Sequence, residues 1–541
     1  MSAARWANAA WRASAAPDAR RLRRAFADPE RAQTRLLLAT LRRNAETEAG
    51  RRWGFGEIRS LRQFQDRVPL VTYDGLAESV ERVRSGARGV LTAEPVRLLE
   101  PTGGSSGGTK LIPFTRTLQR QIRRAVGPWV ADLFARWPAA ARGPAYWSVS
   151  PAVPAPAAEP GAVPVGFEDD AAYLSPVAAR LAGAALAVPS ALRHVTDVEA
   201  FRYATLRLLV ARADLALVSV WNPTFLTLLV APLRAWGDRL ARDLERGTLS
   251  ADLPPAVAAA LRGLRPDVGR AADLRAALAE RDDGALHARL WPRLAVVSAW
   301  ADAHAAGPAA SLARLFPQAH LQPKGLMATE GVVSVPLTEG AALALTSHVF
   351  EFVPEGGGRP AFAHEVEAGR TYRVVLTTGG GLYRYRLGDR VEVTGHAGWC
   401  PLVRFVGRAG GVSDRVGEKL HEGHVRAALD GLGLACAFAL VAPDGDARPA
   451  RYVLFVESAE PDDRLAEAAR GLDAALGANV HYAHARRLGQ LGPVRAVRVA
   501  DGARAYLDGC AALGQRLGSV KSAALHRDGG WAERFGGRPV A

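Results

Sequence analysis

The sequence has little cysteine and no long apolar run. Its 541 residues include three cysteines, Cys400, Cys436 and Cys510, which lie far apart and form no C-x-x-C pair. This spacing favours neither a disulfide framework nor a zinc site and fits a reducing compartment. No stretch reaches about 18 apolar residues, and the N-terminal segment lacks the apolar centre of a secretory signal. We therefore expect a cytoplasmic protein with no transmembrane helix.

Lysine is also scarce, although the chain is basic. The formal net charge is +15, and among 69 lysines and arginines the lysines are Lys110, Lys324, Lys419 and Lys521. Lysine is a compact charge on a flexible stem, whereas arginine is a planar fork, so these four are candidates for function or tight packing. Chance retention is the alternative. The arginines are spread along the chain without an aromatic-interleaved basic patch, which favours a nucleotide over nucleic acid as the anionic partner.

A glycine-rich loop that ends in lysine is the most informative motif. It reads Thr102-Gly103-Gly104-Ser105-Ser106-Gly107-Gly108-Thr109-Lys110 and precedes a helix predicted over 116–136, with Thr115 as its cap. Glycines let backbone amides turn toward an anion, and a lysine can follow phosphate oxygens. Thr109 before the lysine excludes a Walker loop, and the paired glycines exclude the dinucleotide fingerprint. The loop predicts a polyphosphate site, with a flexible linker as the alternative.

The pattern of helices and strands predicts two units. Alternating elements predict an α/β body with a mainly parallel sheet, followed by antiparallel strands from about residue 320 and a smaller α+β unit after about residue 410. Expected helices are 19–45, 73–85 (capped by Thr72 or Asp74), 224–246, 255–264, 271–281, 421–430, 463–476 and 503–515. Expected strands are 146–150, 215–221, 294–297, 332–337, 343–353, 372–377, 383–387, 390–394, 436–441, 451–457 and 495–499, with a loop or lid at 151–166.

Three further patches carry polar residues among apolar strands. Glu330, after Ala328-Thr329, is suited to Mg²⁺ and Thr329 to a phosphate, although an ordinary strand-to-turn junction is an equal alternative. In Tyr383-Arg384-Tyr385-Arg386-Leu387-Gly388-Asp389, a carboxylate at a strand end suits both ribose hydroxyls. A surface ladder is the alternative for Arg384 and Arg386. Arg408 precedes a glycine-rich stretch that is a candidate hinge.

These patches occur in the order seen in adenylate-forming enzymes. More specifically, the chain resembles the auxin-responsive-promoter (Gretchen Hagen) family of acyl acid–amido synthetases, in a bacterial-type version. The resemblance runs nearly end to end. It includes Glu30-Arg31-Ala32-Gln33 through Gly54-Phe55, Val68-Pro69-Leu70-Val71-Thr72-Tyr73, Leu290-Trp291-Pro292, Phe350-Glu351-Phe352-Val353-Pro354 and Asn479-Val480-His481-Tyr482.

The resemblance implies an α/β fold and a two-step reaction. Residues 1–409 would form a large adenylation domain with mixed sheets and a β-barrel-like part, and residues 410–541 a smaller, mobile α+β domain. With ATP and Mg²⁺, the enzyme would adenylate a carboxylic acid and transfer the acyl group to an amine, probably that of an amino acid. A coenzyme A or carrier-thiol ligase and a non-catalytic nucleotide-binding relative are the alternatives. We expect a monomer without nucleic-acid or membrane partners.

The resemblance also assigns roles to residues. Lys521, Lys110 and Glu330 would be catalytic, Glu330 would hold the metal, and Asp414 would be the hinge residue. The ATP-binding residues would be Thr102, Gly103, Gly104, Ser105, Ser106, Gly107, Lys110, Ala328, Thr329, Glu330, Asp389 and Arg408. Leu326 stands where related enzymes often carry an aromatic residue against adenine, and the Pro-Arg that often follows the last lysine is missing after Lys521.

Four residues are candidates for the acyl-acid pocket. They are Trp147, Trp221, Phe225 and His348. Trp147, Trp221 and His348 lie in predicted strands, and Phe225 lies shortly after one. Their side chains suit an apolar, aromatic acid. Ordinary core packing is an equal alternative for all four, and the sequence does not identify the acid or the amine.

Overall fold

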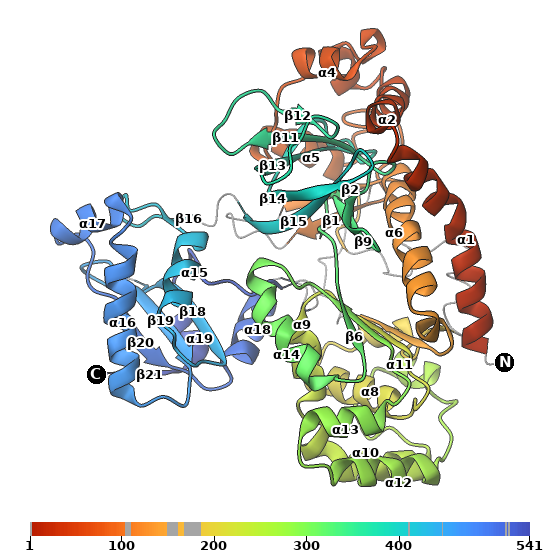
Figure 1. Cartoon of the computed structure of the whole chain (residues 1–541), viewed down its shortest axis with the longest axis vertical. Helices are drawn as coiled ribbons and strands as arrows, with labels where there is room; N and C mark the ends of the chain where they lie inside the picture. Colours follow the sequence, from red (N-terminus) through yellow and green to blue (C-terminus); the bar gives the residue numbers. More distant parts are fainter. Residues whose placement is uncertain are drawn as a thin grey trace. The chain divides into compact units, whose positions relative to one another are not determined.

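The computed structural model describes residues 3–102, 110–148, 161–166, 185–408, 412–445, 447–513, 515, 517 and 520–540. The chain forms two compact units that divide between Val406 and Gly407 (Figure 1). Within the described ranges, no helix combines the length and the apolar character needed to cross a bilayer. The functional assignment of residues 1–409 and 410–541 as two domains stays a prediction.

The first unit begins with two helices rather than one. The helix expected over 19–45 is divided into α1 (Ala3–Ala25) and α2 (Pro29–Arg43). The Asp28 carboxylate accepts a hydrogen bond from the Arg31 N–H at 2.9 Å, and Pro29 takes the first helical position. A carboxylate cap followed by a residue without an N–H starts a new helix, so the prediction of one helix was wrong.

The helix after the glycine loop forms as predicted. It is α6 (Arg116–Arg136), and the Thr115 hydroxyl accepts a hydrogen bond from the Leu118 N–H at 3.1 Å. This side-chain oxygen satisfies one of the amides that a helix leaves without a partner at its start. Two shorter helices precede it, α3 (Glu48–Trp53) and α4 (Leu61–Arg67).

The helix expected over 73–85 begins later than predicted. A single 3₁₀ turn, Asp74–Leu76, leads into α5 (Ala77–Arg84). Leu76 occupies the cap position of α5 and no side chain caps it. The prediction that Thr72 or Asp74 caps this helix was therefore wrong, because Thr72 precedes the 3₁₀ turn and Asp74 is its first residue.

A four-stranded parallel sheet lies within the first unit, as predicted. Its strands pair in chain order and all run in the same direction. Their carboxyl ends therefore share one edge, where open α/β sheets bind ligands. The strands are β3 (Ala145–Trp147), β4 (Leu217–Ser219), β5 (Val296–Ala299) and β6 (His320–Pro323).

Helices in the yellow and green part of Figure 1 accompany this sheet. The helix expected over 224–246 is interrupted at Pro232, which has no N–H to continue a helix. The helix expected over 271–281 begins earlier, because Asp267 caps it by accepting from the Arg270 N–H. The helices are α8 (Val198–Val210), α9 (Pro223–Val230), α10 (Leu233–Arg246), α11 (Pro255–Ala260), α12 (Val268–Leu278), α13 (Asp283–Leu290) and α14 (Ala306–Leu315).

A seven-stranded sheet follows, and the strands from β12 to β14 and from β15 to β9 pair antiparallel, as predicted. The strand order is β12-β11-β13-β14-β15-β10-β9. The two strands expected at 383–387 and 390–394 are one strand, β14. The bounds are β9 (Ser334–Leu337), β10 (Gly340–Leu343), β11 (Val349–Pro354), β12 (Ala361–Phe362), β13 (Thr371–Thr377), β14 (Tyr385–Ala397) and β15 (Cys400–Arg408).

The second unit is α+β, as predicted. A two-stranded ribbon leads into a sheet of order β18-β19-β20-β21, in which β19 and β20 run parallel. The ribbon strands are β16 (Val412–Ser413) and β17 (Leu420–His421). The other elements are α15 (Glu422–Gly431), β18 (Phe438–Pro443), β19 (Tyr452–Glu457), α16 (Asp462–Leu476), α17 (Val480–Arg487), β20 (Arg495–Arg498), α18 (Gly502–Ala512), α19 (Trp531–Phe535) and β21 (Arg538–Pro539).

Candidate ATP and acyl-acid site

The candidate phosphate loop connects the two strands of a hairpin. Strands β1 (Leu98–Thr102) and β2 (Lys110–Phe114) run antiparallel, and Thr102 is the register partner of Lys110. The hairpin therefore holds these two predicted ATP-binding residues opposite each other. The predicted residues Gly103, Gly104, Ser105, Ser106 and Gly107 lie outside the described residues.

Tyr73 supports the lysine end of this hairpin. Its hydroxyl oxygen accepts a hydrogen bond from the Leu111 N–H at 2.8 Å. The Lys110 ammonium lies 5.8 Å from the centroid of the Tyr73 ring, within the range of a cation–π interaction. Tyr73 thus contacts both the backbone N–H of Leu111 and the ammonium group of Lys110. Sequence reasoning noted Tyr73 only as part of a family motif and missed this contact.

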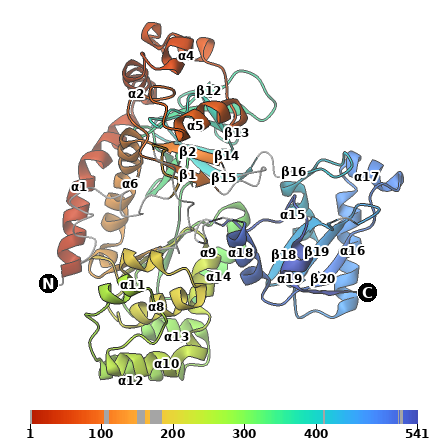
Figure 2. The ribbon, with the colours of Figure 1, turned by 180° about the vertical axis from the view of Figure 1, so that it is seen from behind.

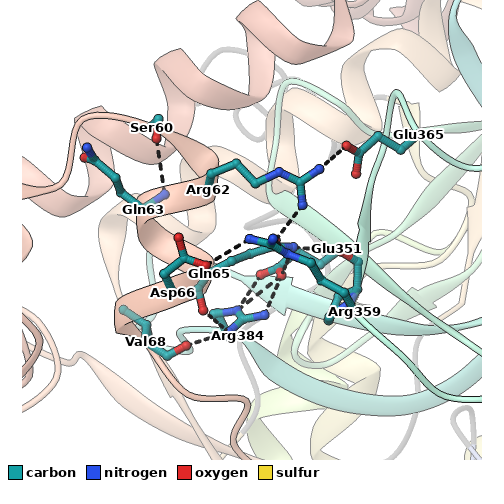
Figure 3. Close-up of polar contacts among 11 residues, drawn as sticks. Ser60, Arg62, Gln63, Gln65, Asp66, Val68, Glu351, Arg359, Glu365 and Arg384 are labelled. Carbon is teal, nitrogen blue, oxygen red and sulfur yellow. Dashed lines mark hydrogen bonds and ion pairs between the residues drawn. The ribbon is translucent and has the colours of Figure 1, made fainter.

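A buried ion pair between Arg384 and Glu351 lies against the segment that ends at Val68, shortly before Tyr73 (Figure 3 shows the pair and this segment). The side chains of Arg384 and Glu351 are 5% and 2% exposed, and Arg384 Nη2 lies 2.7 Å from Glu351 Oε2. Arg384 also donates to the carbonyls of Gln65 and Val68. The interpretation of Arg384 as part of a surface ladder was therefore wrong, because its guanidinium satisfies groups inside the protein.

Backbone pairing continues this link toward Tyr73. The Val71 N–H donates to the Arg384 carbonyl at 3.1 Å, and the Arg386 N–H donates to the Val71 carbonyl at 2.8 Å. Arg384 itself has φ +49°, a conformation that is costly for a residue with a side chain. The Arg386 side chain is exposed, which agrees with the surface alternative for this residue. The motif thus combines one structural and one exposed arginine.

Asp389 lies within a strand, not at its end as predicted. In the pairing of β13 with β14 the register shifts between Arg373 and Val375, so β14 carries extra residues at this point. Gly388 has φ +87°, which glycine adopts without strain. Such bulges redirect side chains and occur next to active sites. Asp389 is 1% exposed, so the bulge fixes a buried carboxylate.

Thr329 and Glu330 form the two-residue turn of a short hairpin. The turn joins β7 (Met327–Ala328) to β8 (Gly331–Val332), and Ala328 pairs with Gly331. Glu330 is 4% exposed. One carboxylate is enough for Mg²⁺ when substrate phosphates supply other ligands, and this oxygen donor fits that ion. Across the described ranges, no group of three or more His, Cys, Asp or Glu side chains is placed to hold a metal.

His348 packs against this hairpin. A Cβ atom at Gly331 would lie 2.9 Å from His348 Nε2, so a larger residue at position 331 would displace the ring. His348 is fully buried, and among the described residues neither of its ring nitrogens has a hydrogen-bond partner. The ring therefore supports the turn that carries Glu330. Its predicted role in the acyl pocket stays a prediction.

The burial of His348 predicts that acid destabilises the protein. Burial lowers the pKa of His348 from 6.5 to about 3. Between these values the unfolded chain binds a proton that the folded chain does not. The free energy of unfolding therefore falls as the pH falls, by up to about 1.4 kcal/mol per pH unit. We expect His348→Leu to show a smaller loss of stability than the parent between about pH 6.5 and pH 4.5 in urea unfolding. Equal losses in the two proteins would contradict this prediction.

Two predicted acyl-pocket residues meet at a buried lysine. Lys324 is 4% exposed, and its ammonium donates to the Ser219 hydroxyl at 2.7 Å. The ammonium lies 4.3 Å from the ring centroid of Trp129, 5.2 Å from that of Trp221 and 5.7 Å from that of Trp147. Apart from Trp129, these residues lie at or just after the carboxyl ends of the parallel strands. Lysine scarcity pointed to Lys324, whereas nothing in the sequence singled out Trp129.

Phe225 has different surroundings. It is 7% exposed on α9 and belongs to the hydrophobic core around the parallel sheet. The structure thus brings Trp147 and Trp221 together at one ammonium. Phe225 and His348 both lie in packed interior positions, and the pocket assignment of all four stays a prediction.

The remaining candidates lie on the C-terminal part of the chain. Asp414 accepts a hydrogen bond from the Gly417 N–H at 2.7 Å, and Gly417 has φ +98°. The Lys521 carbonyl accepts from the Tyr506 hydroxyl at 3.1 Å, and Arg408 is the last residue of β15. Asp414 therefore closes a tight turn. The hinge, catalytic and ATP-binding roles of Asp414, Lys521 and Arg408 stay predictions.

Comparison with known proteins gives the same family over most of the chain. The GH3 family N-terminal domain matches residues 18–320, the central domain residues 341–408 and the C-terminal domain residues 423–529. A probable indole-3-acetic acid-amido synthetase of Oryza sativa subsp. japonica is 27% identical over 464 residues, covering 76% of this chain and 70% of the relative. One of Arabidopsis thaliana is 25% identical, covering 79% and 74%.

Solved structures share the fold. The GH3.15 acyl acid amido synthetase in complex with 2,4-DB superposes with a TM-score of 0.84 at 20% identity, covering 97% of this chain and 96% of that one. A 2-hydroxyisobutyryl-CoA ligase gives a TM-score of 0.50 at 13% identity, covering 87% and 86%. The expected fold, that of an acyl acid amido synthetase with a C-terminal domain, is confirmed. The chain belongs to the GH3 family.

Proposed function

We propose that this chain is an ATP-dependent acyl acid amido synthetase. Membership of the GH3 family over most of the chain carries the proposal. Two of its relatives are probable indole-3-acetic acid-amido synthetases, a name for an enzyme that joins an acid to an amine. The same unit of this chain holds the Lys110 hairpin, the Glu330 turn and the Asp389 bulge.

The proposed reaction has two steps. A carboxylate oxygen of the acid attacks the α-phosphorus of ATP, and the bond to the departing pyrophosphate breaks. An amine nitrogen then attacks the acyl carbon, AMP leaves, and the nitrogen gives up a proton. Both steps move negative charge onto phosphate oxygens, so fixed cations and donors lower the barrier.

Different residues of the chain would serve different parts of this reaction. Lys110 and Thr102 would bind the phosphates, with Tyr73 holding Lys110 in place. Mg²⁺ at Glu330 would neutralise phosphate charge, and Asp389 would accept hydrogen bonds from the ribose hydroxyls. Lys521 is the proposed second catalytic lysine.

The acyl acid would bind at the carboxyl edge of the parallel sheet. Trp147 and Trp221 supply aromatic surface there, with Lys324 packed against both rings. This lining suits an apolar, aromatic acid. The three cysteines are free, which fits the cytoplasmic location that we propose. We also propose that the chain acts as a monomer.

Pyrophosphate exchange tests the first step, and product trapping tests the second. We expect exchange between labelled pyrophosphate and ATP only when a suitable acid from a broad carboxylic-acid panel is present. Incubation with amino acids should then yield an amide, and incubation with coenzyme A should yield no thioester. A thioester instead of an amide would assign the chain to the thiol ligases. Absence of exchange with every acid would contradict the proposed function.

A further inference from the structure

Helices α1 and α6 run side by side (Figures 1 and 2). A basic cleft is lined by residues of these two helices. The helices approach closely at Gly127, where a Cβ atom would lie 3.3 Å from Asp18 Cβ. Beside this contact the cleft has a volume of about 170 Å³. Its polar lining consists of Ser14 and Asp18 from α1 and Arg120, Arg123 and Arg124 from α6.

The three arginines share one part of the α6 surface. Positions 120, 123 and 124 are three and four residues apart, which makes them neighbours on a helix. Their three positive charges face one carboxylate in the lining, that of Asp18. Asp18 forms an ion pair with Arg21, and Arg120 forms one with Glu94 at 3.1 Å. Asp18 is thus engaged with an arginine outside the lining, and Glu94 is engaged with one of the three cleft arginines, Arg120.

Arg123 and Arg124 have no such partner. Within the described part of the chain, neither guanidinium makes a hydrogen bond or an ion pair with an acid, and Arg123 Nε is buried without an acceptor. Burial, and then the charge of Arg120, lower the pKa of Arg123. Burial, and then Arg21, lower the pKa of Arg124. Partly buried like charges without acceptors are unfavourable, and an anion in the cleft would relieve both effects.

We propose that this cleft binds a phosphate-type dianion. Guanidinium forks match the oxygens of a tetrahedral oxyanion, and a net lining charge of about +2 balances a dianion. The volume suits one phosphate group, either free or as the end of a phosphomonoester. The site uses Arg123 and Arg124 and is separate from the Lys110 hairpin.

Hydrogen bonds connect helix α6, which lines the cleft, to other parts of the first unit. On other faces of the same helix, Gln121 accepts a hydrogen bond from the Gly379 N–H at 2.7 Å, and the Trp129 indole donates to Gln322 at 2.9 Å. Helix α6 also begins directly after β2, the strand that starts at Lys110. An anion that fixes α6 against α1 would therefore stabilise the framework that carries the candidate active site.

Thermal unfolding and calorimetry of the full chain test the proposal. At constant ionic strength, we expect sodium phosphate to raise the unfolding temperature more than sodium chloride does. Arg123→Gln/Arg124→Gln should weaken phosphate binding by about tenfold or more for each guanidinium lost. Arg123→Lys/Arg124→Lys, which keeps the charge without the fork, should bind with intermediate affinity.

A second groove provides the matched control. It lies along α2 and contains three arginines with Asp28 and Glu30, so its net charge is lower. Arg35→Gln/Arg42→Gln should keep the full response to phosphate. Tighter binding of an alkyl phosphate than of inorganic phosphate would identify a phosphomonoester as the ligand, and equal or weaker binding would identify free phosphate.

Lys110→Ala separates this site from the proposed function. The cleft predicts that this variant still binds phosphate, whether or not the chain adenylates acids. An equal response to phosphate and chloride would overturn the proposal. So would an unchanged response in Arg123→Gln/Arg124→Gln, or its loss in Lys110→Ala.

Discussion

Lys110→Ala is expected to lower acid-dependent ATP–pyrophosphate exchange by about a hundredfold or more. The ammonium faces phosphate charge that grows during adenylation, and loss of one such group costs about 10²–10³ in rate. Lys110→Arg should not restore the rate, because a planar fork on a longer side chain places its charge differently. Steady-state exchange with saturating acid measures the effect.

Two variants serve as comparisons in this experiment. Tyr73→Phe keeps the ring but removes the acceptor of the Leu111 N–H. We expect it to raise the KM for ATP by about threefold to tenfold, because one hydrogen bond positions the strand that starts at Lys110. Asp389→Ala should also abolish exchange, through loss of ribose binding. Full exchange activity in Lys110→Ala, with unchanged thermal unfolding, would exclude Lys110 from the ATP site.

Arg384→Met is expected to lower the free energy of unfolding by about 3–5 kcal/mol. It leaves the Glu351 carboxylate buried without its partner and removes the donors to two backbone carbonyls. Glu351→Leu/Arg384→Met should be less destabilised than Arg384→Met alone, because no lone charge stays buried. Urea unfolding followed by fluorescence measures both values.

An exposed arginine–glutamate pair provides the control. Arg82 and Glu48 form two hydrogen bonds, at 2.6 and 2.7 Å, but their side chains are 47% and 44% exposed. Solvent screens that pair, so Arg82→Met should leave the stability unchanged within error. If Arg82→Met and Arg384→Met lower the free energy of unfolding by the same amount, burial is not the reason for the effect at Arg384.

Local signals made much of the fold predictable. Thr115 could be assigned as a cap because the capping oxygen and its amide lie three residues apart. The parallel and antiparallel sheets also followed from the order and spacing of the apolar runs. The break between α1 and α2 was a local signal too, at Asp28-Pro29, that our prediction overlooked.

The site depended more on contacts distant in sequence. Asp389 could be selected by its motif, but its place in a bulge depends on pairing with β13. Arg384 looked like a surface residue, because its partner Glu351 lies 33 positions away and Gln65 lies 319 positions away. A pattern among neighbouring residues in the sequence does not indicate a partner that is so distant along the chain.

The sequence by itself determined the family, the order of the chemical patches and the importance of its rare lysines. Glycine content, spacing and residue type are local, and they specify which groups are present. Tertiary structure decided which of these groups meet: Lys110 with Tyr73, Lys324 with three tryptophans, and two arginines of α6 in a cleft against α1. Burial and electrostatic pairing depend on neighbours in space, which packing of the whole unit brings together.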